Sequence, residues 1–285
     1  MATDISQRIL SAFPTFSKGQ KKLASVIIND YDKAAYMTAA KFGNMVGVSE
    51  STVVRFATQL GYDGYGEMQK AVQELVKAKL TPNQRIEITK KRFGKGNVIE
   101  SVMESDIEKI RYTLENINID SFHKSIDAIL DAKTIYIIGA RSTEPIARLL
   151  SYNLSLIFDN VKFINPTSTA EVFEQMFSIG EKDTLIAFSF PRYSSKMVGG
   201  VKYAKSCGAK IVIVTDSEIS PLAEYADSML LAQTDMASFM DSLIAPVSII
   251  NAMVVEITRR RESEIIKRFD KLEQIWDEYK VYTKK

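Results

Sequence analysis

The chain has 285 residues, of which 46% are hydrophobic and 25% charged, and its formal net charge at pH 7 is +2. This length is enough for about two domains of ~100–200 residues each, and the composition is that of an ordinary globular protein. The small net charge excludes a polycation that binds nucleic acid over its whole surface, so any nucleic-acid interface must be local.

The sequence lacks the features of secreted, membrane-spanning and zinc-binding proteins. A single cysteine, Cys207, cannot form an intrachain disulfide, and no apolar run approaches the ~20 residues that span a bilayer. The N-terminal segment MATDISQRIL has no secretory signal, and one histidine, His123, is too few for a usual zinc site. We therefore expect a cytoplasmic protein with no membrane partner, no cofactor, no metal and no catalytic residue.

Residues 1–80 are predicted to form a helical domain. The apolar residues of SKGQKKLASVIINDYDKAAYM recur at three- and four-residue spacing, and Ser17 is placed to cap this helix. Thr81-Pro82 breaks the pattern. Residues 81–110 are expected to be a connector with a partial helix, because they begin with several Lys and Arg and few large apolar residues. Apolar positions from Val98 to Leu114 predict a further helix.

The stretch VGVSESTVVRFATQL predicts the second helix of a helix-turn-helix. Gly47 suits a tight corner, Ser49 suits the cap of the next helix, and the apolar residues of that helix fall on one side. These apolar residues are Val53, Phe56, Ala57 and Leu60. On such a helix the other face enters the major groove of DNA. The residues expected to contact operator DNA are Ser49, Ser51, Thr52 and Arg55. The same spacing also fits an ordinary helical hairpin with a capping serine and a solvated arginine.

With its continuation LGYDGYGE, this stretch resembles the N-terminal helix-turn-helix of the RpiR family of bacterial transcription regulators. The resemblance covers roughly residues 1–77 and is dense rather than confined to one motif. It implies that the partner of this domain is double-stranded operator DNA.

From Thr134 onward the pattern changes to short apolar runs rich in β-branched residues, separated by helical segments. The runs are TIYIIGA, VKFIN, TLIAFSF, KIVIVTD and SMLLAQ. Near-continuous apolar strands that alternate with helices are typical of a parallel sheet covered on both faces. Residues 111–261 are therefore predicted to form a doubly wound α/β domain with a five-stranded parallel sheet. Its ligand is expected at the carboxyl ends of the strands.

Two strand ends carry hydroxyl and guanidinium groups. The first strand ends in IIGARSTEPIARLL and the third in AFSFPRYSSKMV. Hydroxyls beside the free N–H groups of a helix N-terminus form an anion site, although each serine taken singly also fits a helix cap. The residues expected to bind an effector are Gly139, Arg141, Ser142, Thr143, Ser189, Arg192, Tyr193 and Ser194.

This half resembles a SIS (sugar isomerase) domain over roughly residues 121–258, and the segment AKSCGAKIVIVTDSEISPLAEYADSMLL adds to the likeness. The resemblance implies a phosphosugar ligand held by Gly139 and Ser142 and by Ser189 and Ser194. Arg141 and Arg192 stand where the family motifs have glycine, and Pro191 stands where they have a serine. These departures indicate an altered anion site, since arginine favours bidentate binding of phosphate or carboxylate.

The two resemblances together imply a transcriptional regulator controlled by a small anionic metabolite, a phosphosugar or another sugar-derived acid. The alternative is a sugar-phosphate isomerase that uses the same pocket. That enzyme would need a general base, and the carboxylates available near the motifs are those of Glu144, Glu171 and Glu174. An isomerase would leave the DNA-reading module without a role.

Residues 262–285 are predicted to form a C-terminal amphipathic helix. Its apolar residues are spaced four, three, four and three apart: Ile265, Phe269, Leu272, Trp276 and Tyr279. Two heptads are too short for an independent coiled coil, so the stripe must pack on its own α/β domain or on another subunit. We expect a homodimer or a homotetramer with this helix at a subunit contact.

Overall fold

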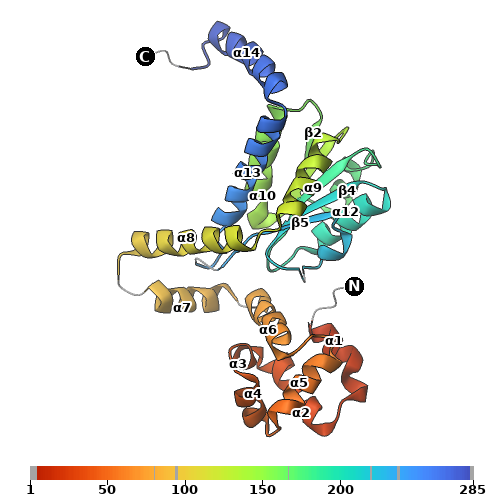
Figure 1. Ribbon diagram of the computed structural model, residues 1–285, viewed down its shortest axis with the longest axis vertical. Coiled ribbons are helices and arrows are strands. Elements are labelled where there is room, and N and C mark those ends of the chain that lie inside the picture. Colours follow the sequence, from red (N-terminus) through yellow and green to blue (C-terminus); the bar gives the residue numbers. More distant parts are fainter. Residues whose placement is uncertain are drawn as a thin grey trace.

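The N-terminal third of the chain is helical and the remainder is built around a parallel sheet (Figure 1). A computed structural model describes residues 5–79, 81–93, 96–165, 167–218, 220–235 and 238–282. The ends of the expected first and last domains, at 1–4, 80 and 283–285, lie outside these ranges. The predicted fold class, a helical domain followed by a doubly wound α/β domain, is confirmed.

Six α-helices form the first domain. They are α1 (Ile5–Ala12), α2 (Lys18–Asn29), α3 (Tyr31–Ala34), α4 (Ala39–Val46), α5 (Glu50–Gln59) and α6 (Tyr65–Lys79). Ser17 caps α2 as predicted, since its side chain accepts a hydrogen bond from the Gln20 N–H. Fully buried side chains such as Leu23, Phe42 and Phe56 make one core under these helices.

Helix α6 is an integral part of this domain. The Tyr65 hydroxyl and the Gln69 amide both donate to the Met37 carbonyl at 2.7 Å. Burial raises the pKa of Tyr65 to about 12, so its hydroxyl stays protonated and remains a donor. The beginning of α6 is thus fixed to the Met37 carbonyl, just before α4, by partly buried hydrogen bonds.

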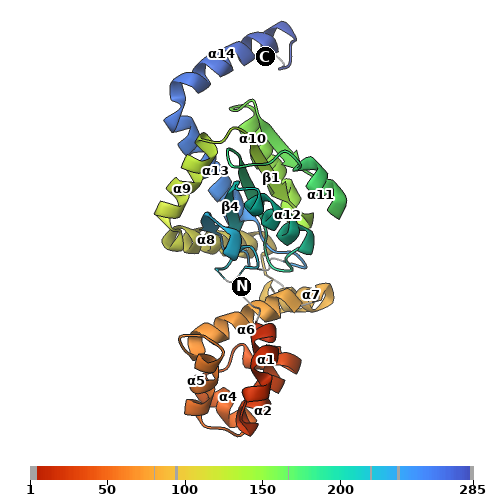
Figure 2. The same ribbon diagram turned by 90° about the vertical axis from the view of Figure 1, so that its right-hand side faces the viewer.

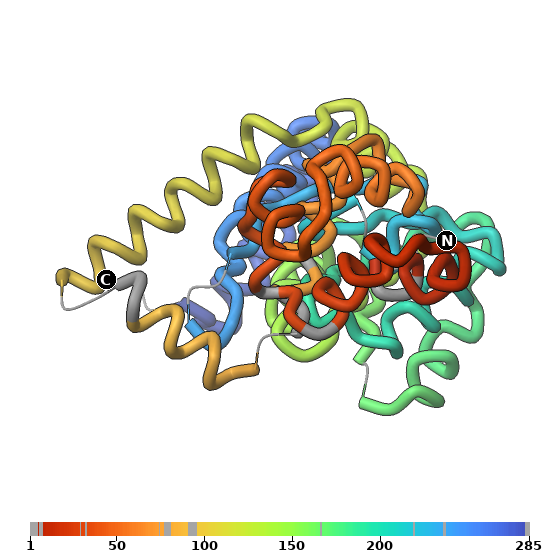
Figure 3. The backbone as a smooth tube through the Cα atoms, turned by 90° about the horizontal axis from the view of Figure 1, so that it is seen from below, coloured from red at the N-terminus to blue at the C-terminus, as the bar shows by residue number. Residues whose placement is uncertain are grey.

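The connector differs from its prediction. It consists of two full helices, α7 (Pro82–Phe93) and α8 (Val98–Asn116), which form the arms of a hairpin extending to one side (Figure 3). Helix α8 runs through the expected boundary at residue 110. The prediction missed α7 because this helix is polar on most sides, and Arg85 is the one buried side chain among those described at positions 82–90.

Helix α8 has an unusual distribution of side chains. It buries Ser105, Lys109 and Thr113, and the Lys109 ammonium donates to the Ser105 hydroxyl at 2.7 Å. Its large apolar side chains face solvent instead. They include Ile99, Met103, Ile107, Ile110 and Leu114. A soluble helix normally buries its apolar stripe, so this exposed stripe is a candidate contact surface.

The second domain alternates strands and helices. Its elements are α9 (Ile119–Leu130), β1 (Ile135–Gly139), α10 (Glu144–Ser155), β2 (Val161–Ile164), α11 (Thr169–Gln175), β3 (Thr184–Phe188), α12 (Ser195–Ser206), β4 (Lys210–Thr215), β5 (Ser228–Leu231) and α13 (Ile244–Arg260). The strand order is β2-β1-β3-β4-β5, and all pairings are parallel.

Helices cover both faces of the sheet. Along β1, Ile135 and Ile137 pack with α9, α10 and α13, whereas Tyr136 and Ile138 pack with α11 and α12. Both sets are buried because successive strand residues point to opposite faces. This arrangement explains the near-continuous apolar strands in the sequence.

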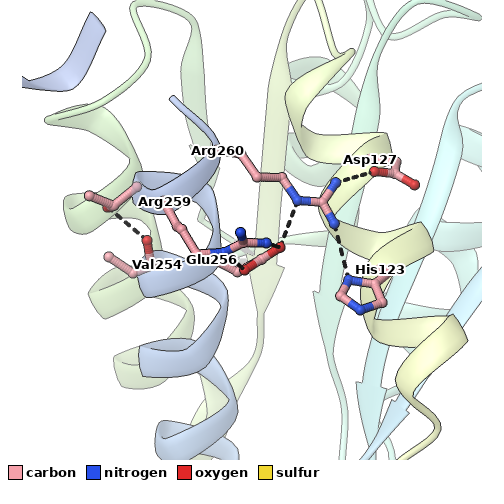
Figure 4. A network of polar contacts seen from close by, with 7 residues as sticks. His123, Asp127, Val254, Glu256, Arg259 and Arg260 are labelled. Atoms are coloured by element: carbon pink, nitrogen blue, oxygen red, sulfur yellow. Dashed lines mark hydrogen bonds and ion pairs between the residues drawn. The ribbon is translucent and has the colours of Figure 1, made fainter. Parts of the chain in front are cut away.

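A charged network joins α13 to α9 at the edge of the sheet domain (Figure 4). The Arg260 guanidinium donates to Glu256 at 2.7 Å, lies 3.0 Å from Nδ1 of His123, and also pairs with Asp127. Hydrogen bonds from Arg259 and Arg260 lower the pKa of Glu256 to about 2. Glu256 is therefore ionised at neutral pH, and the network holds the end of α13 in place.

Helix α14 (Glu262–Glu278) projects away from the sheet domain (Figures 1 and 2). Ile265 is buried, and Phe269, Leu272 and Trp276 are half-buried, whereas Tyr279 is exposed. The intrachain packing of the predicted apolar stripe is thus partial. None of the helices in the described ranges is both long enough and apolar enough to cross a membrane.

Candidate functional site

A cavity of about 260 Å³ lies at the carboxyl ends of β1 and β3. These strands are neighbours although β2 lies between them in sequence, so the chain turns to opposite sides of the sheet at this point. Ligands of open α/β sheets bind at such a switch point. The volume is slightly below the range of drug-sized ligands and suits a small metabolite.

The loop after β1 is held against the loop after β3. The Thr143 hydroxyl accepts the Ala140 N–H at 2.9 Å and lies 3.0 Å from the Phe188 carbonyl, which ends β3. Gly139 permits this turn, because a Cβ atom there would lie 2.6 Å from the Thr143 carbonyl oxygen. Gly139 and Thr143 therefore shape the pocket, and the Thr143 hydroxyl is occupied by these structural contacts.

Three serines provide hydroxyl groups to the pocket: Ser142, Ser189 and Ser194. Within the described part of the chain, none of these hydroxyls makes a hydrogen bond to another protein group. Ser194 occupies the N-cap position of α12, yet its side chain makes no capping hydrogen bond. Its hydroxyl and the first N–H groups of α12 together form a geometry that suits an anion.

Arg141 and Arg192 both have a left-handed backbone, with φ of 60° and 68°. Lys280 is the only other non-glycine residue with positive φ in the described ranges. For an L-residue with a Cβ atom this conformation costs roughly 1–2 kcal/mol, whereas glycine adopts it freely. These are the two positions where the motifs that this chain resembles have glycine, and glycine would adopt this backbone without strain. Strain of this kind is concentrated at functional sites.

One wall of the pocket was not predicted from the sequence. Arg85 from α7 and the segment Phe239–Asp241 also line it. The Arg85 guanidinium pairs with the Asp241 carboxylate at 2.8 Å, and the Arg85 side chain is only 3% exposed. Arg85 belongs to no sequence motif. Its place in the pocket depends on a contact with Asp241, which lies 156 positions away in the sequence.

Six of the eight predicted effector residues line the cavity. They are Arg141, Ser142, Thr143, Ser189, Arg192 and Ser194. Gly139 and Tyr193 do not line it, although they lie in the same two loops. The Tyr193 hydroxyl donates instead to the Asp216 carboxylate at 2.9 Å, at the end of β4.

The helix-turn-helix has the geometry that the sequence predicts. Gly47 ends α4 in a left-handed conformation, with φ of 76°. A Cβ atom on Gly43 would lie 2.7 Å from the Val48 carbonyl, so this second glycine allows α4 and α5 to cross closely. Val53, Phe56 and Ala57 of α5 are fully buried, and their positions fix which face of α5 is free.

The outer face of α5 carries residues that were predicted to contact operator DNA. Ser51 and Arg55 are exposed, and Thr52 is half-buried. The Ser49 hydroxyl accepts the Thr52 N–H at 3.3 Å and lies 2.9 Å from the Ser51 hydroxyl. Ser49 therefore caps the helix, and the exposed Arg55 side chain donates through Nε to the Ser51 carbonyl at 3.3 Å.

Comparison with known proteins finds a matching family model for each half of the chain. The model of the rpiR-family helix-turn-helix domain matches residues 3–79, and the SIS domain model matches residues 128–256. An uncharacterized HTH-type transcriptional regulator of Clostridium perfringens is 24% identical over 259 residues, which cover 88% of this chain and 91% of the relative.

Two solved structures share the fold. The NanR protein of Vibrio vulnificus, solved in complex with ManNAc-6P, is 18% identical, with a TM-score of 0.62 over 96% of this chain and 98% of NanR. The sugar isomerase domain of an RpiR transcription factor from Sphaerobacter thermophilus is 21% identical, with a TM-score of 0.58 over 61% of this chain and 96% of that chain.

The strain at Arg141 can be measured by comparing two substitutions. Arg141→Gly and Arg141→Ala both remove the guanidinium, but only alanine keeps a Cβ atom in the left-handed conformation. We expect the glycine variant to be more stable than the alanine variant by about 1 kcal/mol. Urea unfolding of both variants measures the difference. Equal stability would mean that Arg141 relaxes out of this conformation in solution.

Proposed function

Because this chain belongs to the RpiR family of transcriptional regulators, we propose that it binds operator DNA through α5 and that a small anionic metabolite controls this binding. The observation that carries the proposal is the combination of a helix-turn-helix with a pocket that holds free hydroxyls and arginines at the β1/β3 switch point. A DNA-reading module and a metabolite site in one chain are the two parts that a ligand-responsive regulator requires.

Recognition of DNA is assigned to the exposed face of α5. Helix-turn-helix proteins insert this second helix into the major groove, where arginine pairs with guanine through two hydrogen bonds. Arg55 is exposed one turn after the N-terminus of α5, and Ser51 and Thr52 lie beside it. We propose that Arg55 contacts bases and that Ser51 and Thr52 contact bases or phosphates.

Replacing Arg55 should weaken sequence-specific binding without unfolding the domain. A bidentate arginine–guanine pair contributes ~1–3 kcal/mol of discrimination, so Arg55→Ala should bind a cognate duplex about ten-fold more weakly or worse. The duplex can be selected from a random pool by the full-length protein, and affinities measured by fluorescence anisotropy. Lys182→Ala removes an exposed cation from the α/β domain and should bind normally. Unchanged specificity in Arg55→Ala would show that another element reads the bases.

The effector is assigned to the anionic sugar derivatives. A phosphate monoester carries roughly −1.5 to −2 charges at pH 7 and three acceptor oxygens, which match serine hydroxyls and arginine forks. NanR, which has the same fold, was solved with the phosphosugar ManNAc-6P. Because Arg141 and Arg192 add positive charge, the pocket should also prefer ligands with more negative charge, such as phosphorylated sugar acids.

The effector pocket can be tested with a double variant. Ser142→Ala with Arg192→Ala should abolish the rise in melting temperature caused by any sugar phosphate that stabilises the wild-type protein, because both loops lose a ligand group. A control variant, Lys202→Ala with Ser206→Ala, removes the same kinds of group from the far end of α12 and should respond normally. DNA binding without ligand should stay near normal in both. A full thermal response in the pocket variant would refute this placement.

The geometry favours a binding pocket over an isomerase site. Asp241 is the only carboxylate among the described residues that line the cavity, and it is paired with Arg85. Glu144, one of the carboxylates considered as a base, pairs with Arg148 at 2.9 Å and does not line the cavity. Glu171 and Glu174 lie on α11, and neither lines the pocket. An aldose–ketose isomerase needs a free base beside the substrate, so we assign this chain to regulation.

We also propose that the chain acts as a homodimer or a higher homo-oligomer. The apolar stripe of α8 is exposed, with Ile99 at 71% and Met103 at 62%, and α14 projects beyond its own domain (Figure 2). A second copy of this chain would cover both surfaces. Paired reading helices would then reach two half-sites about one DNA turn apart.

Assembly can be tested on α8 and α14 separately. Met103→Glu with Ile107→Glu should lower the mass measured by light scattering, because two buried carboxylates would oppose association while each stays solvated in the isolated chain. Glu108→Gln on the same helix is the control and should leave the mass unchanged. Deletion of residues 262–285 should also lower it. If both changes leave the mass unaltered, neither helix lies at the subunit contact.

A further inference from the structure

The arginine that α7 contributes to the pocket is unusual in its burial. Arg85 is 2% exposed, although the other side chains described at positions 82–90 of α7 are exposed or half-buried. The first turn of α7 is fixed by reciprocal hydrogen bonds, in which the Thr81 N–H donates to the Gln84 side chain at 2.9 Å and the Gln84 N–H donates to the Thr81 hydroxyl at 3.3 Å. Arg85 follows this capping box and is thereby directed into the α/β domain.

The partner of Arg85 lies on a segment that both connector helices hold. Asp241 pairs with Arg85 of α7, and the adjacent Ser242 hydroxyl donates to the Asp106 carboxylate of α8 at 2.7 Å. Phe239 and Met240 precede this pair and line the cavity with it. One wall of the pocket is therefore attached to the connector between the two domains.

The charges around the cavity match a ligand of charge about −2. Its charged lining residues are Arg85, Arg141, Arg192 and Asp241, so three positive charges and one negative charge leave a formal sum of +2. Arg141 and Arg192 are exposed, whereas Arg85 is shielded from solvent. A hydrogen bond from a shielded guanidinium to an anion is stronger than one made in water. Five N–H donors allow one arginine to bind Asp241 and a second anion together.

We propose that Arg85 is an effector-binding residue and that its contact with the anionic group of the effector transmits occupancy to the DNA-binding domain. The inference rests on the effector pocket proposed above and adds a residue from outside the SIS domain. Arg85 follows closely after Lys79, where α6 of the helix-turn-helix domain ends. An anion that also binds the Arg85 guanidinium alters the ion pair between Arg85 and Asp241. It therefore changes the stability of the contact between the connector and the pocket. A ligand shifts an equilibrium only through such differential contacts.

Inorganic phosphate serves as the probe, because the effector itself is unidentified. Isothermal titration of the full-length protein should show that Arg85→Gln binds phosphate about ten-fold more weakly or worse, the effect of losing one charge-assisted hydrogen bond. Lys90→Gln removes one exposed charge from the same helix and should bind as the wild type does. Arg85→Lys keeps the charge but loses the planar fork, and it should also bind more weakly.

The outcomes separate this inference from the pocket assignment. If Arg85→Gln binds phosphate normally while Ser142→Ala with Arg192→Ala does not, the pocket stands and the role of Arg85 is refuted. If the wild type does not bind phosphate, or if all variants bind it equally, both proposals fail. Should Arg85→Gln not fold because Asp241 loses its counter-charge, Arg85→Gln with Asp241→Asn restores neutrality. That double variant should fold and still bind phosphate weakly, and normal binding would refute the inference.

Transmission to DNA needs a second measurement. The affinity for the selected duplex is compared with and without phosphate, at constant ionic strength because salt alone weakens DNA binding. The wild type and Lys90→Gln should show the same change in affinity. Arg85→Gln should show a smaller change even at phosphate concentrations that saturate its pocket. A full change in the saturated variant, or no change in the wild type, would refute the transmitting role of Arg85.

Discussion

The whole candidate site depends on the parallel pairing of β1 with β3. Because both strands run in the same direction, their carboxyl ends meet at one edge, and the loops that follow them converge. The Thr143 hydroxyl fixes this convergence through its contact with the Phe188 carbonyl. Ser142 and Ser194 then face one cavity although they lie on different crossovers. The parallel pairing of these two strands therefore brings serines from separate loops into one candidate anion site.

Sequence periodicity predicted the elements that have local signals. Ser17 and Ser49 cap the helices they were expected to cap, and the five apolar runs form the five strands. The missed features depend on contacts distant in sequence. Helix α7 was missed because the side chain it buries at positions 82–90 is Arg85, in an ion pair with Asp241 that no periodicity reveals. Tyr193 was expected in the pocket from its position in a loop, but a bond to Asp216 turns it toward β4.

Helix α8 was predicted correctly as a helix, but the prediction did not say which of its sides is buried in the same chain. Apolar spacing predicts an amphipathic helix correctly, but it does not say which side packs on the same chain. Here Lys109 and Thr113 face inward, and Thr113 accepts the Gln233 N–H at 2.9 Å. The polar side binds the segment that leads to the pocket wall, which leaves the apolar side outward. Intrachain contacts and the proposed subunit contact thus occupy different sides of one helix.

The left-handed backbone of Arg141 and Arg192 also has an evolutionary consequence. Arginine and glycine codons are related by a single base change, so each position lies one mutation from the residue that fits its backbone without strain. At each position, one mutational step therefore exchanges a positive charge for a backbone free of strain.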